Sequence, residues 1–319
     1  MTTPVLEILR CPVCGEPLTA SDGELACAGC GARYAVEDGI PRMLDDRLPG
    51  IAEKRAEIAG WVEKASQEGW YRSDDAVDRV LPYVCRDLGW DDPIWRANEY
   101  SFERLLDHYV QPGDRLLEVG AAKCWAAAHL LPRGCEYVGT DILTDSYIGL
   151  GRGAFYAERV GDFPRVQADA EHLPFADESF DVTFCVATLH HALDLRAMVA
   201  EMGRVTRRGG VVAALNEGTR GLRSSADAPG QRGERELGIN EHVHTVWAYL
   251  GAFARAGLVV RRLIPADGDF SRAARSRAGR LLLRLPRGES LATIALHSFR
   301  EYGGISLFAS RGVRGRKRP

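Results

Sequence analysis

Residues 118–141 read EVGAAKCWAAAHLLPRGCEYVGTD, and this stretch decides the fold. Residues 115–119 form a short apolar strand, the run after Gly120 has helical spacing, and residues 137–140 form a second strand that ends at Asp141. A strand, a tight loop, a helix and a second strand in this order make half of a nucleotide-binding α/β unit. Asp141 follows the first acid of the stretch by 23 positions, so its carboxylate can accept hydrogen bonds from two ribose hydroxyls.

The loop GAAKC at residues 120–124 differs from the dinucleotide pattern GxGxxG, because it has one glycine where that pattern has three. A pyrophosphate requires closer backbone approach than Ala122 and Cys124 readily allow. The segment instead resembles motif I of the class I S-adenosylmethionine-dependent methyltransferases, with Glu118 in the acidic position. Ala121, Ala122 and Lys123 depart from that family's more glycine-rich loop.

The resemblance continues through residues 168–189, ADAEHLPFADESFDVTFCVATL, which are similar to the family's third and fourth motifs. Residues 194–205 then read as an amphipathic helix, Gly209 and Gly210 as a turn, and residues 211–215 as a fifth strand. Order and spacing over residues 115–215 resemble the ubiquinone-biosynthesis-like branch of small-molecule methyltransferases.

This resemblance implies an α/β fold, a Rossmann-like seven-stranded methyltransferase sheet with helices on both faces. It also implies S-adenosylmethionine as cofactor, with Asp169 near the adenine amino group. The residues that it assigns to cofactor binding are Glu118, Gly120, Ala121, Asp141, Ile142, Asp169, Ala170 and Val186. The alternative is another doubly wound fold without this cofactor.

Two CxxC pairs open the chain, Cys11 with Cys14 and Cys27 with Cys30, and twelve residues separate them. Each pair can place two thiolates on one metal, and the glycine after each pair allows the backbone to turn toward sulfur. We expect a structural Zn²⁺ site, because four sulfur ligands leave no open position for catalysis. A redox pair or disulfides are the alternative, but the first ten residues show no signal peptide, so a cytoplasmic chain with reduced thiols is expected.

The wider N-terminal segment resembles the small zinc-ribbon proteins related to the activator subunit of tRNA and protein methyltransferases. In that family the ribbon is a separate partner, whereas here it is fused, which implies a domain that supports the catalytic fold or meets its substrate. We therefore predict a zinc ribbon at residues 1–46, a helical linker or lid at 47–100, and a methyltransferase domain at 101–319 with a basic insertion around 270–290.

Four tryptophans lie between the ribbon and the methyltransferase domain, ahead of a helix whose apolar residues Phe102, Leu105, Leu106 and Tyr109 share a face. They are Trp61, Trp70, Trp90 and Trp95. Aromatic side chains here suit a helical lid over the cofactor, or they pack the ribbon against the core. Among the aromatic residues of the linker, Tyr100 and Trp95 are expected to reach the active site.

Charge is uneven along the 319 residues. The net charge is −3, yet residues 271–319 hold twelve Lys or Arg and two acids, which leaves −13 on residues 1–270. Residues 272–287 contain six arginines and no acid around an apolar LLLRL run, and the chain ends RGVRGRKRP. Such runs bind phosphates or form a solvated face. Strands expected at 258–264 and 305–309 make the arginine segment an insertion, on the substrate side or the back edge of the sheet.

Composition favours a globular protein, since 45% of the residues are hydrophobic and the length suits one domain of about 200 residues with smaller additions. No apolar run approaches the roughly 18 residues of a spanning helix, so membrane insertion is not expected.

Methyl transfer from a sulfonium requires positioning of two reactants and, for a hydroxyl acceptor, removal of a proton. His190 and His191 follow the fourth strand, while His242 and His244 precede a later helix. Each histidine is a candidate base or a residue that merely caps or packs. Glu217, after the fifth strand, is a further candidate.

Three functions remain open from the sequence. The first is methyl transfer to a small molecule or a glycan in a biosynthetic pathway, which the acidic body and the motif order favour. The second is methylation of an RNA base, with the ribbon and the arginine segment holding RNA. The third is a non-catalytic scaffold that binds the cofactor. Neither the acceptor atom nor the oligomeric state can be read from the sequence.

Overall fold

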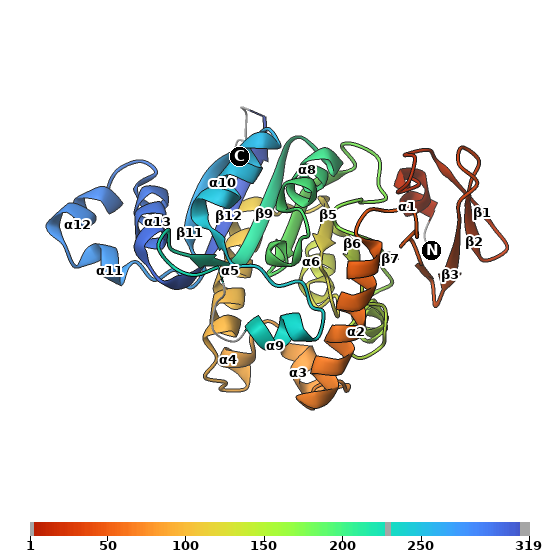
Figure 1. The fold of residues 1–319 in the computed structure, drawn as a ribbon, viewed down its shortest axis with the longest axis horizontal. Coiled ribbons are helices and arrows are strands. Elements are labelled where there is room, and N and C mark those ends of the chain that lie inside the picture. The colour runs from red at the N-terminus through yellow and green to blue at the C-terminus, as the bar shows by residue number, and fades with distance from the viewer. Residues whose placement is uncertain (1–2, 227–230, 313–319) are drawn as a thin grey trace.

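The computed structural model describes residues 3–226 and 231–312. Within these ranges, a small antiparallel sheet at one end of the molecule precedes a large central sheet that helices cover on both faces (Figure 1). The basic run at the end of the chain, from residue 313 on, lies outside the described residues.

The large sheet follows the order β11-β12-β9-β8-β5-β6-β7, with a short β10 beside β9. Its strands are β5 (Arg115–Val119), β6 (Glu136–Asp141), β7 (Arg165–Gln167), β8 (Phe180–Val186), β9 (Thr206–Arg220), β10 (His244–Thr245), β11 (Leu258–Pro265) and β12 (Tyr302–Arg311). Strands β5 to β9 pair in parallel, whereas β12 is antiparallel to both β9 and β11. This arrangement confirms the predicted Rossmann-like methyltransferase sheet.

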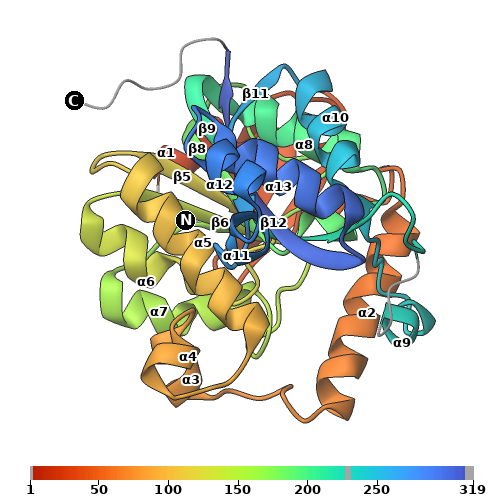
Figure 2. The same cartoon turned by 90° about the vertical axis from the view of Figure 1, so that its left-hand side faces the viewer.

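Side chains alternate along each strand and so supply two hydrophobic cores, one on either face of the sheet. On β5, Leu116 joins one core, whereas Leu117 and Val119 join the other. Helices α5 (Pro93–Tyr109), α6 (Ala127–Leu130) and α7 (Gly153–Val160) cover the Leu116 face, and α8 (Leu195–Val205) and α10 (Val246–Arg255) cover the opposite face (Figure 2).

The segment that decided the fold differs from prediction in its helix. Residues 120–126 form a loop of turns after β5, and helical structure is limited to α6 and a 3-10 turn at Leu131–Arg133. The predicted turn at Gly209 and Gly210 is also wrong, because both glycines lie within β9. Gly209 adopts a φ of 76°, and the pairing of β9 with β8 is interrupted there.

The N-terminal unit contains α1 (Thr3–Ile8) and an antiparallel sheet of β1 (Leu18–Ser21), β2 (Glu24–Cys27), β3 (Arg33–Glu37) and β4 (Ile40–Pro41). It attaches to the edge of the large sheet through backbone hydrogen bonds. The Arg10 amide donates to the Pro174 carbonyl at 2.9 Å, and the Met43 amide donates to the Gln167 carbonyl of β7 at 3.1 Å. Leu9 is fully buried in the core that both units share, so the N-terminal unit packs against the large domain.

Between the two units, the chain forms α2 (Ile51–Gln67), α3 (Asp75–Val80), α4 (Val84–Asp87) and α5. Helix α5 begins at Pro93 because the Asp92 carboxylate accepts the amides of Ile94 and Trp95 at 2.8 and 3.2 Å. The helix therefore crosses the boundary that we predicted at residue 100 between linker and methyltransferase domain.

After β9, the chain forms α9 (Gln231–Glu236), and between β11 and β12 it forms α11 (Ser271–Ala274), α12 (Arg277–Leu283) and α13 (Gly288–Phe299). Both predicted strands flanking the arginine segment are present and longer than expected, as β11 and β12. Helix α13 packs on the sheet, while α11 and α12 form the end of the molecule farthest from the small sheet (Figure 1). None of the helices in the described ranges is long and apolar enough to cross a bilayer.

Candidate functional site

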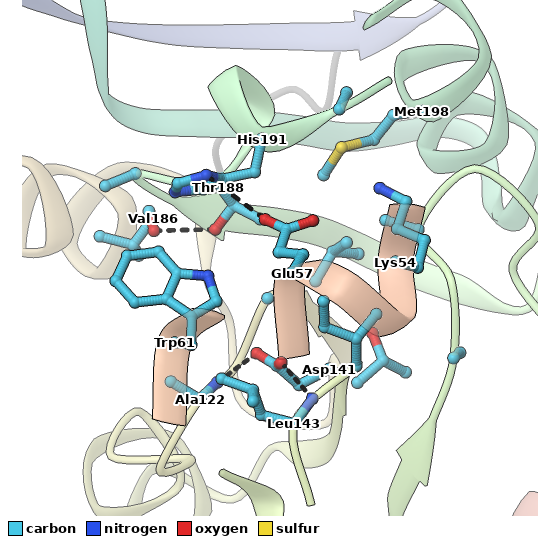
Figure 3. A pocket seen from close by; sticks show the side chains of 18 of the residues that line it. Lys54, Glu57, Trp61, Ala122, Asp141, Leu143, Val186, Thr188, His191 and Met198 are labelled. Carbon is cyan, nitrogen blue, oxygen red and sulfur yellow. Dashed lines mark hydrogen bonds and ion pairs between the residues drawn. The ribbon is translucent and has the colours of Figure 1, made fainter. Parts of the chain in front are cut away.

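A cavity of about 270 Å³ lies where β5, β6 and β8 end, and the Asp141 carboxylate is in its wall. One carboxylate oxygen accepts the Ala122 amide and the other accepts the Leu143 amide, each at 2.8 Å (Figure 3). Burial raises the pKa of Asp141 to about 6, although these two amides oppose the increase. The carboxylate therefore joins the loop after β5 to the loop after β6, and each of its oxygens retains a lone pair for a ligand.

Backbone geometry in this loop explains how it functions with a single glycine. Gly120 has a φ of 71°, and a Cβ there would lie 2.3 Å from Thr188 Cγ2. Ala122 and Cys124 also adopt positive φ, 43° and 62°, in the left-handed region that usually favours glycine. The chain therefore reaches the conformation of a glycine-rich loop with residues that bear the strain, and such strain concentrates at functional sites.

Five of the eight predicted cofactor-binding residues line this cavity: Gly120, Asp141, Ile142, Ala170 and Val186. The other three, Glu118, Ala121 and Asp169, are buried and are not among its lining residues. Glu118 accepts a hydrogen bond from the Tyr137 hydroxyl, and burial raises its pKa to about 8. Asp169 accepts the Glu171 amide at 3.0 Å and contacts the His172 ring. Each of these two acids is thus engaged with the protein.

Helix α2 covers the cavity with Trp61, one of the four tryptophans considered for a lid, and with Lys54 and Glu57, to which the sequence analysis gave no role. Lys54, Glu57 and Trp61 are spaced three and four residues apart, which places them on one face of the helix, directed at the cavity (Figure 3). Lys54 forms a buried ion pair with Glu171 at 3.1 Å, and Trp70 adds a second indole to the lining. Burial raises the pKa of Glu57 to about 7. The helical spacing of two charges and a tryptophan was the available signal.

A second cavity, of about 370 Å³, adjoins the first. Ala187 lines both cavities, so they meet at the loop after β8. The second cavity lies between the first turn of α5, which contributes Ile94, and the ends of β9, β11 and β12. Asn216 and His190 are in its wall. Ala187 and Asn216 have positive φ of 50° and 53°, as in the loop of the first cavity.

His190 and Glu217 form a buried pair at the junction. Nδ1 of His190 lies 2.9 Å from a Glu217 carboxylate oxygen, and the other oxygen accepts the amides of Thr188 and Leu189 at 3.0 and 3.1 Å. Burial lowers the pKa of His190, but the hydrogen bond and charge of Glu217 outweigh burial and raise it above the usual value. With Nδ1–H donated to Glu217, Nε2 is the ring nitrogen left for chemistry.

The ring of His191 lies against that of His190, with centroids 4.2 Å apart. His191 also lines the first cavity. Its Nδ1 donates to the Asn240 carbonyl at 2.7 Å, and burial holds its pKa well below the usual value. Glu241 approaches both rings, so the three side chains offer ligand atoms within 4.8 Å of one another. Because His190 Nδ1 and His191 Nδ1 are both used within the protein, Nε2 is the atom that each ring leaves for a ligand or a proton.

Four other predicted residues lie elsewhere. His244 and His242 line neither cavity, and burial lowers the pKa of both, to about 4 for His244. The expectation that Trp95 and Tyr100 reach the active site is wrong for both cavities, because they pack against the core on the α5 face of the sheet. Trp61 of α2 and Trp70, which follows the helix, line the first cavity instead.

The four N-terminal cysteines converge as predicted. The Sγ atoms of Cys11 and Cys30 are 3.5 Å apart, those of Cys14 and Cys27 are 3.4 Å apart, and all four lie within 4.8 Å of one another. The Ala32 amide lowers the pKa of Cys30 to about 7. The Glu16 amide lowers the pKa of Cys14, but burial and the other sulfurs raise it to about 12. A cation among the sulfurs would favour the thiolate form of Cys14.

With this geometry established, comparison with known proteins defines the class. Residues 117–214 match the family described as "Methyltransferase domain", and residues 4–39 match the family described as "Trm112p-like protein". The chain thus carries a methyltransferase domain behind a Trm112p-like domain, as the sequence resemblance indicated.

Curated relatives match the central part of the chain. The demethylmenaquinone methyltransferase of Mycobacterium sp. (strain KMS) is 38% identical over 138 residues, which are 43% of this chain and 54% of that protein. Methyltransferase GfsG of Streptomyces halstedii is 33% identical over 135 residues, which are 41% of this chain and 48% of that protein. The chain spans about half the length of the curated relatives it matches.

Solved structures share the fold over a greater length. Geranyl diphosphate C-methyltransferase from Streptomyces coelicolor A3(2) aligns with a TM-score of 0.56 at 17% identity, over 84% of this chain and all of that chain. The [4+2]-cyclase SpnF aligns with a TM-score of 0.51 at 17% identity, over 82% of this chain and 97% of that one. Because a cyclase shares it, the fold alone does not specify methyl transfer.

The strained loop yields a stability prediction. Ala122→Gly should raise the free energy of unfolding by about 1 kcal/mol, because glycine removes the left-handed penalty while its amide still donates to Asp141. The matched control is Ala128→Gly in α6, where the same exchange should lower stability by about 0.5–1 kcal/mol. Urea unfolding measures both, and equal losses at the two positions would contradict the strain assignment.

Proposed function

We propose that this protein is an S-adenosylmethionine-dependent methyltransferase that acts on a small molecule or a glycan in a biosynthetic pathway. The observation that carries the proposal is the junction of two cavities at Ala187, one beside the Asp141 carboxylate and the other beside His190. A transfer reaction requires a donor site and an acceptor site that meet at the reacting atom, and this geometry supplies both.

The first cavity fits the cofactor in its chemistry. Asp141 would accept hydrogen bonds from the ribose, and Ile142, Leu143 and Ala170 offer apolar walls for the adenine. Gly120 provides close backbone approach for the methionine part. Burial raises the pKa of Glu57 to about 7, and a cationic ligand nearby would stabilise its carboxylate form. A sulfonium is such a ligand. The two curated relatives described above are methyltransferases.

The second cavity fits the acceptor. S-Adenosylmethionine supplies an electrophilic methyl group on sulfur, and an acceptor hydroxyl must lose a proton as it attacks. His190 would take that proton on Nε2, and Glu217 would stabilise the resulting imidazolium through Nδ1–H. The acceptor oxygen gains the methyl group, and the sulfur departs as a neutral thioether.

A structural zinc ion completes the proposal. Tetrahedral Zn²⁺ bound to four thiolates has Zn–S bonds of about 2.3 Å, which gives sulfur separations near those between Cys11 and Cys30 and between Cys14 and Cys27. The ion would stabilise the N-terminal unit and leave the chemistry to the large domain. A cytoplasmic location belongs to this proposal, since it keeps the thiols reduced.

Methylation of RNA is the alternative, favoured by the Trm112p-like domain and by the six arginines of residues 272–287. Against it, residues 1–270 carry −13, and a negatively charged body repels a phosphate backbone. The deciding assay incubates the full chain and labelled cofactor with a small-metabolite extract in one arm and total RNA in the other. Label in the metabolite fraction supports the proposal, label in RNA supports the alternative, and label in neither supports the scaffold.

Cofactor affinity should depend on Asp141. Asp141→Ala removes the acceptor for the ribose hydroxyls and should weaken binding of S-adenosylmethionine by about 1–3 kcal/mol, roughly fivefold to 150-fold in Kd. Calorimetry measures the change, with the exposed Asp177→Ala as control. Equal affinity in parent and Asp141→Ala would remove Asp141 from the site.

The pH dependence should report the His190–Glu217 pair. The rate should rise with pH through the pKa of His190, which Glu217 raises, because only the unprotonated ring accepts a proton. In Glu217→Gln the rising limb should move to lower pH, since the imidazolium loses its counter-charge. The plateau should fall by about 10²–10⁴-fold, because the amide favours the wrong tautomer.

Cofactor affinity measured by calorimetry is the control for Glu217→Gln and should stay unchanged. A plateau equal to that of the parent would show that His190 does not act as the base.

Metal analysis tests the ribbon. We expect one Zn²⁺ per chain, bound by Cys11, Cys14, Cys27 and Cys30. Cys14→Ser should lose most of the metal and lower the melting temperature, because metal binding contributes to folding. Cys85→Ser, outside the cluster, is the matched control. A Cys14→Ser protein with full zinc and an unchanged melting curve would exclude the assignment.

A further inference from the structure

The segment that forms α11 and α12, residues 271–287, is here named the basic arm. Its six arginines are Arg272, Arg275, Arg277, Arg280, Arg284 and Arg287, and all are exposed. None of the six forms an ion pair with a carboxylate in the part of the chain that the structure describes. An acidic body that carries six exposed cations at one end presents a local site for an anionic surface.

Large aliphatic side chains are interleaved with these charges. Leu281 in the last turn of α12 is 62% exposed, and Leu285, two residues beyond the helix end, is 51% exposed, with Arg284 between them in sequence. Arg277 precedes Leu281 by one turn and so shares its side of the helix. Exposed leucines do not stabilise a cationic face that contacts only water. Apolar residues flanked by arginines are instead typical of a segment that lies in a membrane interface.

The composition separates a bilayer from a nucleic acid as the occupant. Proteins hold single-stranded RNA by stacking bases on aromatic rings beside their basic groups. The basic arm contains no aromatic residue. Leucines gain free energy by leaving water for acyl chains, and arginines gain it beside anionic headgroups. A bilayer with anionic headgroups can therefore bind both the leucines and the arginines of the arm.

The arm also has a defined place relative to the second cavity. Ala266 and Asp267, just before the arm, line that cavity, and so does Arg300, at the end of α13. Helix α13 is anchored to β11 by an ion pair of Glu289 with Arg262 at 2.9 Å. The arm thus projects from the wall of the proposed acceptor cavity on a fixed support.

We propose that the basic arm docks this protein on a bilayer surface that contains anionic lipids, through Leu281 and Leu285 and the six arginines around them. Docking by the arm brings the second cavity next to the bilayer, which fits a lipophilic acceptor. That last step rests on the proposed function, whereas docking itself does not.

Cosedimentation of the full chain with vesicles tests the docking, without cofactor or acceptor. We expect binding to vesicles of phosphatidylglycerol and phosphatidylcholine, and at least tenfold weaker binding to phosphatidylcholine alone. Leu281→Ser with Leu285→Ser should weaken binding about tenfold to a hundredfold at unchanged charge. Arg277→Gln, Arg280→Gln and Arg284→Gln together should weaken it about a hundredfold.

Two controls match these variants. Leu88→Ser alters an exposed leucine outside the arm, and the triple change Arg33→Gln, Arg86→Gln and Arg208→Gln removes the same charge elsewhere. Both should bind like the parent. Binding that falls equally in arm and control triple variants would indicate net charge alone and overturn the proposal.

Three other results would also overturn it: no vesicle binding, loss of self-association in the leucine variant without loss of vesicle binding, or tight RNA binding that only the arm variants lose. Because vesicle binding is measured without methyl transfer, its failure is separate from failure of the proposed activity. Methyl transfer without vesicle binding would retain the function and reject the arm.

Discussion

The Asp141 carboxylate is the constraint on which the first cavity depends. It ends β6 and accepts one amide from the loop after β5 and one from its own loop, so two segments of backbone are fixed by a single side chain. The loop after β5 can then adopt positive φ at Ala122 without a second glycine, because the hydrogen bond offsets part of the strain. The cavity wall and the geometry of the two loops are thus coupled at one residue.

Local pattern in the sequence was enough to predict several strands and the position of Asp141, whereas the whole sheet was implied by the resemblance to methyltransferases. Strand periodicity and the position of an acid at the end of a strand are properties of adjacent residues, and β5, β6, β8 and β11 appeared where expected. The helix after Gly120 was predicted too long, because helical spacing of apolar residues does not reveal that backbone turns precede α6.

The cover of the cavity could not be predicted in the same way. Lys54 meets Glu171, more than one hundred residues later, and a contact at that separation leaves no periodic signal. His190 and His244 were equal candidates in the sequence. They differ because Glu217 lies beside His190, whereas His244 is buried with an unpartnered Nε2. The convergence of the four cysteines was predicted correctly because the spacing within each CxxC pair is itself local.

The cover has a consequence for the rate at which ligands exchange. Helix α2 is held at one end by the buried pair of Lys54 and Glu171 and at the other by Lys64 and Glu234, 2.6 Å apart. Gly60 lies between them, where a Cβ would be 2.3 Å from the Leu237 carbonyl oxygen, so the helix is tightly seated. Lifting α2 would separate the buried pair of Lys54 and Glu171, so ligand exchange along that side of the cavity would be slow.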